Sequence, residues 1–197
     1  MTPARHEKLT QVLRRRQSDL TVVLENVFDP HNISAVMRTC DAVGVQEIFI
    51  LNTKIPRHKK FGARSSSSAA KWLTVHSFED ATRCFEEIRR RYERVLTTHL
   101  GESSAGLYEL DLTRPTALVF GNEHSGVSEE IRALADGNFL IPQAGIIQSL
   151  NISVACAVTL YEAYRQKEQA GHYFRDDLGS DFKRSVWEQW STGEAES

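Results

Sequence analysis

Three polar stretches of the sequence contain residue types that could bind an anion. They span residues 26–38, 121–126 and 148–153, and they include Asn32, Arg38, Glu123, Ser149 and Asn151. An arginine stays protonated, so Arg38 is a poor base but a good partner for a phosphate. The other four side chains can donate and accept the hydrogen bonds that position such a group. These residues predict a ligand site with a polyanion partner, and they leave the reaction open.

Each polar stretch follows a segment whose pattern predicts a buried strand. Residues 20–24 are an apolar run, residues 46–51 (QEIFIL) predict a second strand, and residues 33–43 between them have helical spacing that ends at Gly44. A strand–helix–strand unit of this length is typical of a parallel sheet, in which ligands bind beyond the carboxyl ends of the strands. Further strands are predicted over residues 94–98, 117–121 and 139–141.

The remaining segments predict helices around this sheet and one long loop. Helical spacing occurs over residues 3–17, 78–91, 128–135, 149–169 and 182–190. Residues 53–71, with four consecutive serines, predict a mobile loop, and loops of this length are uncommon unless they are functional. We therefore expect an α/β domain over residues 20–170, with a basic helical extension over 1–19 and a second helical extension over 171–197.

Basic residues are concentrated in two segments, although the 197-residue chain has a formal net charge of −2. Residues 1–16 carry five Arg and Lys against one Glu, and residues 54–71 carry six with no acid. Local patches of this kind suit a polyanion even on a chain that is neutral as a whole. Charge clusters by themselves nevertheless favour solvated surface runs over a binding site.

Several other functional classes are disfavoured by the sequence. Cys40, Cys84 and Cys156 form neither a disulfide framework nor a zinc pattern, which indicates a reducing, cytoplasmic setting without a bound metal. No signal-peptide stretch and no apolar run long enough for a membrane span occur, so we expect no membrane partner. The Gly-x-Gly-x-x-Gly, P-loop and Gly-x-Ser-x-Gly patterns are also missing, which argues against dinucleotide-binding enzymes, P-loop enzymes and hydrolases.

The polar stretches, taken as complete motifs, resemble those of the SpoU branch of the SPOUT methyltransferases. The motifs span residues 32–44, 118–128 and 141–155, and they occur in the order and with the spacing of that family. The resemblance covers roughly residues 20–170. Within the branch, the chain is most similar to the TrmH group, which methylates the 2′-hydroxyl of guanosine 18 in the tRNA D-loop. The Arg-rich first helix and the short C-terminal helical extension support this placement.

The resemblance implies a fold, a cofactor and an assembly. The fold is a SPOUT α/β-knot, with a parallel sheet and a deep trefoil knot in its C-terminal part, and the family normally works as a homodimer through the knot region. The knot loops are expected to hold S-adenosylmethionine, which leaves as S-adenosylhomocysteine, and no metal is required. By motif match, the cofactor pocket comprises Thr98, Leu100, Gly121, Asn122, Gly126, Ile141, Ile146, Ser149 and Leu150.

The resemblance also implies catalytic roles for the five polar residues. Arg38 is expected to contact the ribose 2′-hydroxyl and an RNA phosphate together. It would either pass the proton through that phosphate or stabilise the developing alkoxide. The others are expected to hold Arg38 and the cofactor loops in place: Asn32, Glu123, Ser149 and Asn151. Their alternative roles are structural, as helix caps or, for Glu123, as a solvated loop acid.

The expected partner is tRNA, held by phosphate contacts from basic side chains. The residues predicted to make them are Arg14, Arg15, Arg16, His31, Lys59, Lys60, Arg64, Lys71 and Arg165. A run of serines stands where the resemblance predicts glycine-rich sequence before Lys71, which leaves the loop conformation and the range of tRNAs open.

Two other functions are compatible with the sequence, namely methylation of ribosomal RNA ribose and RNA binding without catalysis. Relatives that act on ribosomal RNA usually carry a larger N-terminal RNA-binding domain, whereas about 20 residues precede the first predicted strand here. The presence of Arg38 and its four polar partners argues against a non-catalytic protein.

Overall fold

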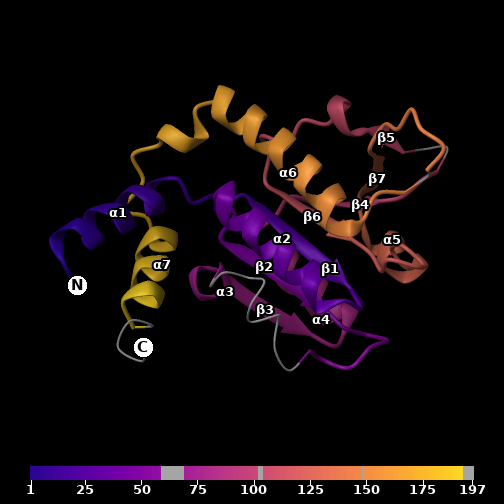
Figure 1. Ribbon diagram of the computed structural model, residues 1–197, viewed down its shortest axis with the longest axis horizontal. Coiled ribbons are helices and arrows are strands. Elements are labelled where there is room, and N and C mark those ends of the chain that lie inside the picture. The colour runs from indigo at the N-terminus through magenta and orange to yellow at the C-terminus, as the bar shows by residue number, and fades with distance from the viewer. Residues whose placement is uncertain (59–68, 102–103, 148, 193–197) are drawn as a thin grey trace.

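Seven strands form one parallel sheet in the computed structural model, which describes residues 1–58, 69–101, 104–147 and 149–192 (Figure 1). The strands are β1 (Leu20–Glu25), β2 (Glu47–Leu51), β3 (Thr74–Phe78), β4 (Arg94–Thr98), β5 (Ala105–Gly106), β6 (Thr116–Phe120) and β7 (Gly137–Leu140). Their order is β3-β2-β1-β6-β4-β7-β5, and every neighbouring pair is parallel. The chain therefore crosses from one side of β1 to the other after β3.

Helices cover both faces of the sheet. The elements are α2 (Pro30–Ala42), α3 (Ala69–Trp72) and α6 (Ile152–Gln169) on one face, and α4 (Ala81–Arg89) and α5 (Glu129–Leu134) on the other. Successive side chains of a strand point to opposite faces, so Val22 and Leu24 pack with α2 and α6 while Val23 packs with α4 and α5. Two short 3₁₀ helices, η1 (Leu107–Glu109) and η2 (His172–Phe174), lie in the connections.

The terminal helices α1 (Pro3–Arg14) and α7 (Asp181–Thr192) pack against each other at one end of the molecule (Figure 1). Their buried contact consists of Leu9, Leu13, Val186 and Trp190. Lys183 of α7 is buried and donates to the backbone carbonyls of Leu13, Arg14 and Arg16 over 2.5–3.1 Å. Lys183 thus supplies hydrogen bonds to backbone carbonyls at and just beyond the C-terminal end of α1, where the regular helical hydrogen bonds stop. Burial lowers the pKa of Lys183 to about 8.

The parallel α/β architecture predicted from the sequence is confirmed, with differences in several elements. The predicted helix over 78–91 is wrong at its start, because β3 ends at Phe78 and α4 begins at Ala81. All five β3 residues are only partly buried, and β3 lies at the sheet edge, so its alternation gives a weak signal. The helix predicted from residue 33 begins at Pro30, and the helix predicted from residue 149 begins at Ile152.

The predicted loop over 53–71 is shorter than expected, because its last residues, 69–71, belong to α3. Residues 59–68 of that loop lie outside the described residues. Within the described ranges, no helix combines the length and the apolar character needed to cross a lipid bilayer.

Candidate functional site

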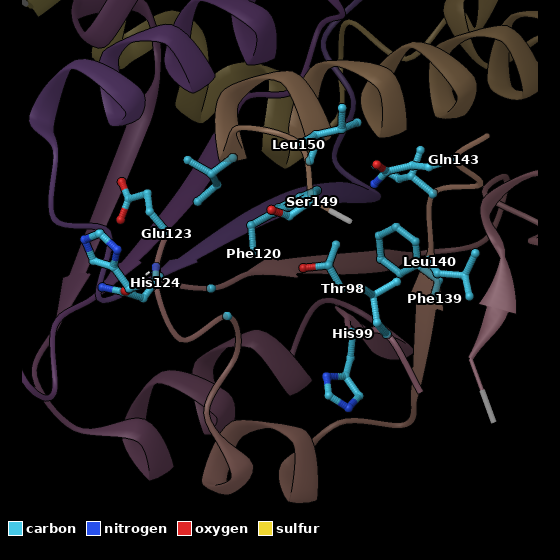
Figure 2. A pocket seen from close by; sticks show the side chains of 17 residues that line it. Thr98, His99, Phe120, Glu123, His124, Phe139, Leu140, Gln143, Ser149 and Leu150 are labelled. Atoms are coloured by element: carbon cyan, nitrogen blue, oxygen red, sulfur yellow. Dashed lines mark hydrogen bonds between the residues drawn. The ribbon is translucent and has the colours of Figure 1, made fainter. Parts of the chain in front are cut away.

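A cavity of about 320 Å³ opens beyond the carboxyl ends of β4, β6 and β7 (Figure 2). It is lined by eight of the nine residues predicted to bind the cofactor, namely Thr98, Leu100, Gly121, Asn122, Gly126, Ile141, Ser149 and Leu150. Glu123, which was predicted to be catalytic, also lines it. Ile146 is not among the lining residues, because its side chain is fully exposed in the loop before Ser149.

The cavity also contains residues that the motif comparison missed. Phe120 and Phe139 form part of its apolar wall, with ring centroids 6.4 Å apart and ring planes at 88°. Figure 2 shows Glu123 and His124 at one end of the cavity and Gln143 at the other. Phe120 lies near the carboxyl end of the strand predicted over 117–121, which is the signal that could have identified it, whereas Phe139 begins the strand predicted over 139–141. The full set of missed residues is His99, Phe120, His124, Phe139, Leu140, Gln143, Ile152 and Ala155.

His99 ties the cavity wall to α5. Its backbone N–H donates to the Phe139 carbonyl over 3.1 Å, and its carbonyl accepts from Ser104 Oγ over 2.8 Å. Arg132 Nη1 lies 2.8 Å from His99 Nε2. Because a guanidinium can only donate, His99 Nε2 is the acceptor of this hydrogen bond. His99 therefore anchors the loop that carries Leu100.

The loop after β6 brings one backbone segment directly against another. Asn122 N–H donates to the Gly126 carbonyl over 3.0 Å, and Gly126 N–H donates back to the Asn122 carbonyl over 2.8 Å. A Cβ atom on Gly121 would lie 2.1 Å from the carbonyl carbon of Gly126 and from the amide nitrogen of Val127. Gly126 has a φ of +66°, in the region that glycine adopts without strain. The shape of this cavity wall therefore requires glycine at position 121.

Asn32, Glu123 and Asn151 form a hydrogen-bonded chain that joins the three polar stretches. Asn32 Nδ2 donates to Glu123 Oε1 over 2.9 Å, and Asn151 Nδ2 donates to Asn32 Oδ1 over 3.2 Å. The Glu123 carboxylate also accepts from the backbone N–H groups of Phe28 (3.2 Å) and Asp29 (3.5 Å). The structure thus brings three of the five predicted catalytic residues together, where they fix the start of α2 against the start of α6.

The ionisation of Glu123 follows from these contacts. Burial raises its pKa, but the hydrogen bonds from Asn32 and from the backbone N–H groups of Glu123, Phe28 and Asp29 outweigh that effect, and the pKa is lowered. Glu123 is therefore ionised at neutral pH, with its oxygens engaged as acceptors. This state suits an anchor for the loops rather than a group that gives or takes a proton.

Substitution of Glu123 by glutamine should lower the melting temperature by about 2 °C at neutral pH, because an exposed anchor of this kind contributes little. The folded-state pKa lies below the ordinary value of 4.5. The carboxylate's contribution is therefore present above that value and is lost as the pH falls through the folded-state pKa. Thermal unfolding of both proteins between pH 3 and 7 should show the difference shrinking at acid pH. Glu130→Gln, an exposed change on α5, is the control, and a difference that stays constant with pH contradicts the prediction.

The helix caps show that Asn32 is not the N-cap of α2 and that Asn151 is the N-cap of α6. Asp29, rather than Asn32, caps α2, since Asp29 Oδ1 accepts from the N–H of the second helical residue over 2.8 Å. Asn32 lies inside the first turn, so the interpretation of Asn32 as a plain N-cap is wrong. Asn151 is the N-cap of α6 and accepts from Ser153 N–H over 2.9 Å. Ser149 precedes that cap and lies in the cavity wall.

Arg38 lies on the exposed side of α2, six residues beyond Asn32. It is not among the residues that line the cavity in the described chain. The predicted catalytic set is therefore divided in this structure: Glu123 and Ser149 belong to the cavity wall, Asn32 and Asn151 to the joined helix starts, and Arg38 to the adjoining helix surface.

The predicted RNA-binding residues differ in where they lie. The exposed ones are Arg14, Arg15, His31, Lys71 and Arg165. Arg16 is 2% exposed, and its guanidinium pairs with Asp41 and lies 5.3 Å from the centre of the Trp190 ring. The prediction of Arg16 as a surface contact is therefore wrong, since its charge is used inside the fold. Lys59, Lys60 and Arg64 lie outside the described residues.

A parallel α/β sheet with a cavity at the carboxyl ends of its strands defines a class of proteins that bind small-molecule ligands at that edge. In the parts of the chain that the structure describes, no group of three His, Cys, Asp or Glu side chains could hold a metal ion. The chain belongs to the SpoU rRNA methylase family, whose profile matches residues 19–161.

Three known proteins illustrate this membership. The chain is 45% identical over 191 residues to tRNA (guanosine(18)-2′-O)-methyltransferase from Thermus thermophilus, which covers 96% of each sequence. It is similar to the crystal structure of the Aquifex aeolicus TrmH/SpoU tRNA modifying enzyme, with a TM-score of 0.88, 36% identity and coverage of 97% of this chain and 96% of that chain. It is also similar to the SpoU methyltransferase AviRb from Streptomyces viridochromogenes in complex with the cofactor AdoMet, with a TM-score of 0.71, 27% identity and coverage of 78% and 62%.

Proposed function

We propose that this protein catalyses S-adenosylmethionine-dependent methylation of the 2′-hydroxyl of guanosine 18 in tRNA. The observation that carries the proposal is the cavity beyond β4, β6 and β7, which gathers eight of the nine predicted cofactor residues. The similarity to a tRNA guanosine 18 enzyme along almost the whole chain supports the choice of tRNA over ribosomal RNA.

The residues of the cavity fit S-adenosylmethionine. The absence of a side chain at Gly121 keeps the two backbone segments together and leaves their amide groups at the cavity wall. Leu100 and Leu150 are exposed apolar side chains at the cavity, suited to the faces of a purine ring, and Thr98 and Ser149 add hydroxyl groups. When bound, S-adenosylmethionine supplies a methyl group that is already activated by a positively charged sulfur.

The chain itself must then position the 2′-hydroxyl, accept its developing charge and exclude water. Arg38 is the residue proposed to meet the hydroxyl, together with an RNA phosphate. Because a guanidinium stays protonated, it acts by stabilising the alkoxide or by holding the phosphate that takes the proton. Asn32, Glu123 and Asn151 act indirectly. Their hydrogen bonds fix α2, which carries Arg38, to the start of α6, which borders the cavity.

We also propose a deep trefoil knot in the C-terminal part of the sheet, a homodimer through the knot region and a cytoplasmic location. Residues 146–154 support the dimer, because four apolar side chains there are exposed, namely Ile146, Ile147, Leu150 and Val154. Exposed apolar surface of this kind is typical of a protein contact. The family match over residues 19–161 supports the proposed domain boundary at residue 20, and the end of α6 at Gln169 supports the one at residue 170.

Methyl transfer from radiolabelled S-adenosylmethionine to unmodified tRNA and to ribosomal RNA, followed by nucleoside mapping, tests the proposal. The expected product is 2′-O-methylguanosine at position 18 of tRNA, with no transfer to a tRNA that carries 2′-deoxyguanosine there. Transfer to ribosomal RNA alone would favour that substrate instead. A folded protein that binds cofactor and RNA without any transfer would favour an RNA-binding role.

A further inference from the structure

Asn26, the residue that follows β1, has an unusual backbone conformation. Among the described residues other than glycine, it alone has a positive φ, of +50°. Few residues with a side chain tolerate this conformation, and asparagine is one of them because its short amide can form local hydrogen bonds. Asn26 is buried, so its amide needs such partners. Glycine would adopt the same backbone with less strain, so what the asparagine adds is the set of contacts made by its side chain.

The side chain of Asn26 holds the segment that follows β2. Asn26 Nδ2 donates to Thr53 Oγ1 over 3.0 Å, and Asn26 Oδ1 accepts from the Lys54 N–H over 2.8 Å. The backbone N–H of Asn26 also donates to the Leu51 carbonyl over 2.8 Å. Three hydrogen bonds therefore fix the end of β2 and the two side-chain contacts beyond it to the end of β1.

The backbone carbonyl of Asn26 holds the loop after β6. It accepts from Asn122 Nδ2 over 2.7 Å. Asn122 Oδ1 in turn accepts from the N–H groups of His124 (2.8 Å) and Ser125 (3.3 Å), so the Asn122 amide shapes this loop. Asn122 and Glu123 both line the cavity proposed to bind S-adenosylmethionine. Asn26 thus connects one wall of that cavity to the segment after β2 through the groups of a single residue.

The segment after β2, residues 53–58, carries exposed positive charge. Lys54 and Arg57 are exposed cations, and the segment contains no acid. Its last residue returns towards β1, because His58 Nε2 donates to the Val27 carbonyl over 2.9 Å. Both ends of segment 53–58 are therefore tied to the loop after β1, and the segment presents two cations that suit the phosphates of an RNA strand.

We propose that Asn26 is a positioning residue for methyl transfer, which keeps an RNA backbone bound to segment 53–58 in line with the methyl donor in the cavity. Phosphate contacts set the register of a nucleic acid, and a misplacement of about 1 Å can cost a transfer reaction about 10²-fold in rate. Two hydrogen bonds of Asn26 join the segment to Asn122 in the cavity wall, which fixes their relative position. This inference rests on the proposed function for the identity of the reaction.

Asn26→Gly should lower kcat for methyl transfer to tRNA at least about 10-fold, because segment 53–58 loses its side-chain contacts. Glycine keeps the left-handed backbone and its carbonyl, so the affinity for S-adenosylmethionine should stay within twofold. A purely structural role would lower the melting temperature and leave kcat of the folded protein unchanged. Thr21→Val, which removes a buried hydrogen bond to the Glu47 carbonyl at the other end of β1, is the matched control. It should melt at a lower temperature and keep kcat within twofold.

A double-mutant cycle with Thr53→Val identifies the path of the effect. This change removes the hydroxyl that accepts from Asn26 Nδ2 and should lower kcat about threefold or more. If Asn26 acts through segment 53–58, the double variant should be no slower than Asn26→Gly alone, because residues in contact have non-additive effects. Additive losses would overturn the proposal, and so would an Asn26→Gly protein with kcat within threefold of wild type.

Salt dependence tests whether segment 53–58 contacts RNA. Lys54→Gln should reduce the slope of log affinity for tRNA against log salt by about 1. Arg114→Gln, an exposed change before β6 at the opposite edge of the sheet, should leave the slope unchanged. An unchanged slope in Lys54→Gln would overturn the proposal. A wild-type protein that transfers no methyl group to either RNA would overturn the proposed function and this inference together, whereas transfer by the wild type at a rate that Asn26→Gly matches would overturn this inference alone.

Discussion

Replacement of Arg38 by lysine is expected to lower kcat for methyl transfer by about 10²-fold or more, while the affinity for S-adenosylmethionine stays within twofold. Lysine keeps the positive charge but loses the planar fork that can hold a hydroxyl and a phosphate together. Loss of one donor that stabilises a developing oxyanion costs about 10²–10³ in kcat. Because Arg38 lies outside the wall of the cavity proposed to bind S-adenosylmethionine, the effect should fall on turnover rather than on cofactor binding.

Single-turnover transfer to tRNA, combined with calorimetric titration of S-adenosylmethionine, measures the two quantities separately. Arg83→Lys, an exposed change on α4 at the opposite face of the sheet, is the matched control and should keep wild-type turnover. An Arg38→Lys protein with kcat within threefold of wild type would show that the fork geometry of Arg38 is not needed.

Gly121→Ala is expected to weaken binding of S-adenosylmethionine at least about 100-fold. The new methyl group would lie 2.1 Å from backbone atoms of Gly126 and Val127, far inside van der Waals contact. Backbone cannot rotate away as a side chain can, so the loop must move and the Asn122–Gly126 hydrogen bonds must break. Overpacking of this kind costs about 1–3 kcal/mol or more. We expect this strain to displace the loop that forms the cavity wall.

Gly145→Ala is the matched control, because a Cβ atom at that position meets nothing within 4 Å. It should bind S-adenosylmethionine as the wild type does and should melt at the same temperature. Circular dichroism of Gly121→Ala should show that the sheet persists while cofactor binding, followed by calorimetry, is lost. Normal cofactor affinity in Gly121→Ala would mean that the loop after β6 does not shape the binding site.

Eight of the nine residues named from the sequence line one cavity because a strand end is coupled to the loop that follows it. Gly121 and Ser149 are far apart in sequence, yet each follows a parallel strand, and the carboxyl ends of such strands meet at one edge. Ile146 does not line that cavity, because its side chain is fully exposed in the loop after β7. Pro30, which favours the first turn of a helix, was the overlooked sign that α2 starts before Ile33.

Contacts between residues that lie far apart in the sequence could not be predicted from local patterns. In the sequence, Arg16 belongs to a basic run that predicts an exposed surface. In the structure it is buried against Asp41 of α2 and Trp190 of α7. The bond between Asn32 and Glu123 likewise joins residues that only the sheet order brings together. That order, with β6 inserted between β1 and β4, depends on how the chain crosses the sheet and not on the hydrophobicity of any one strand.

The position of β6 also has a consequence for the order of events during synthesis. Leu20 of β1 pairs with Thr116 of β6, although almost half of the chain lies between them. While the protein is being made, β1 can pair early with β2, but its other edge must wait until β6 has left the ribosome. An unpaired strand edge is prone to pairing with other chains, and pairings between distant segments form slowly. The newly made N-terminal half should therefore be the stage at which this protein most needs a chaperone.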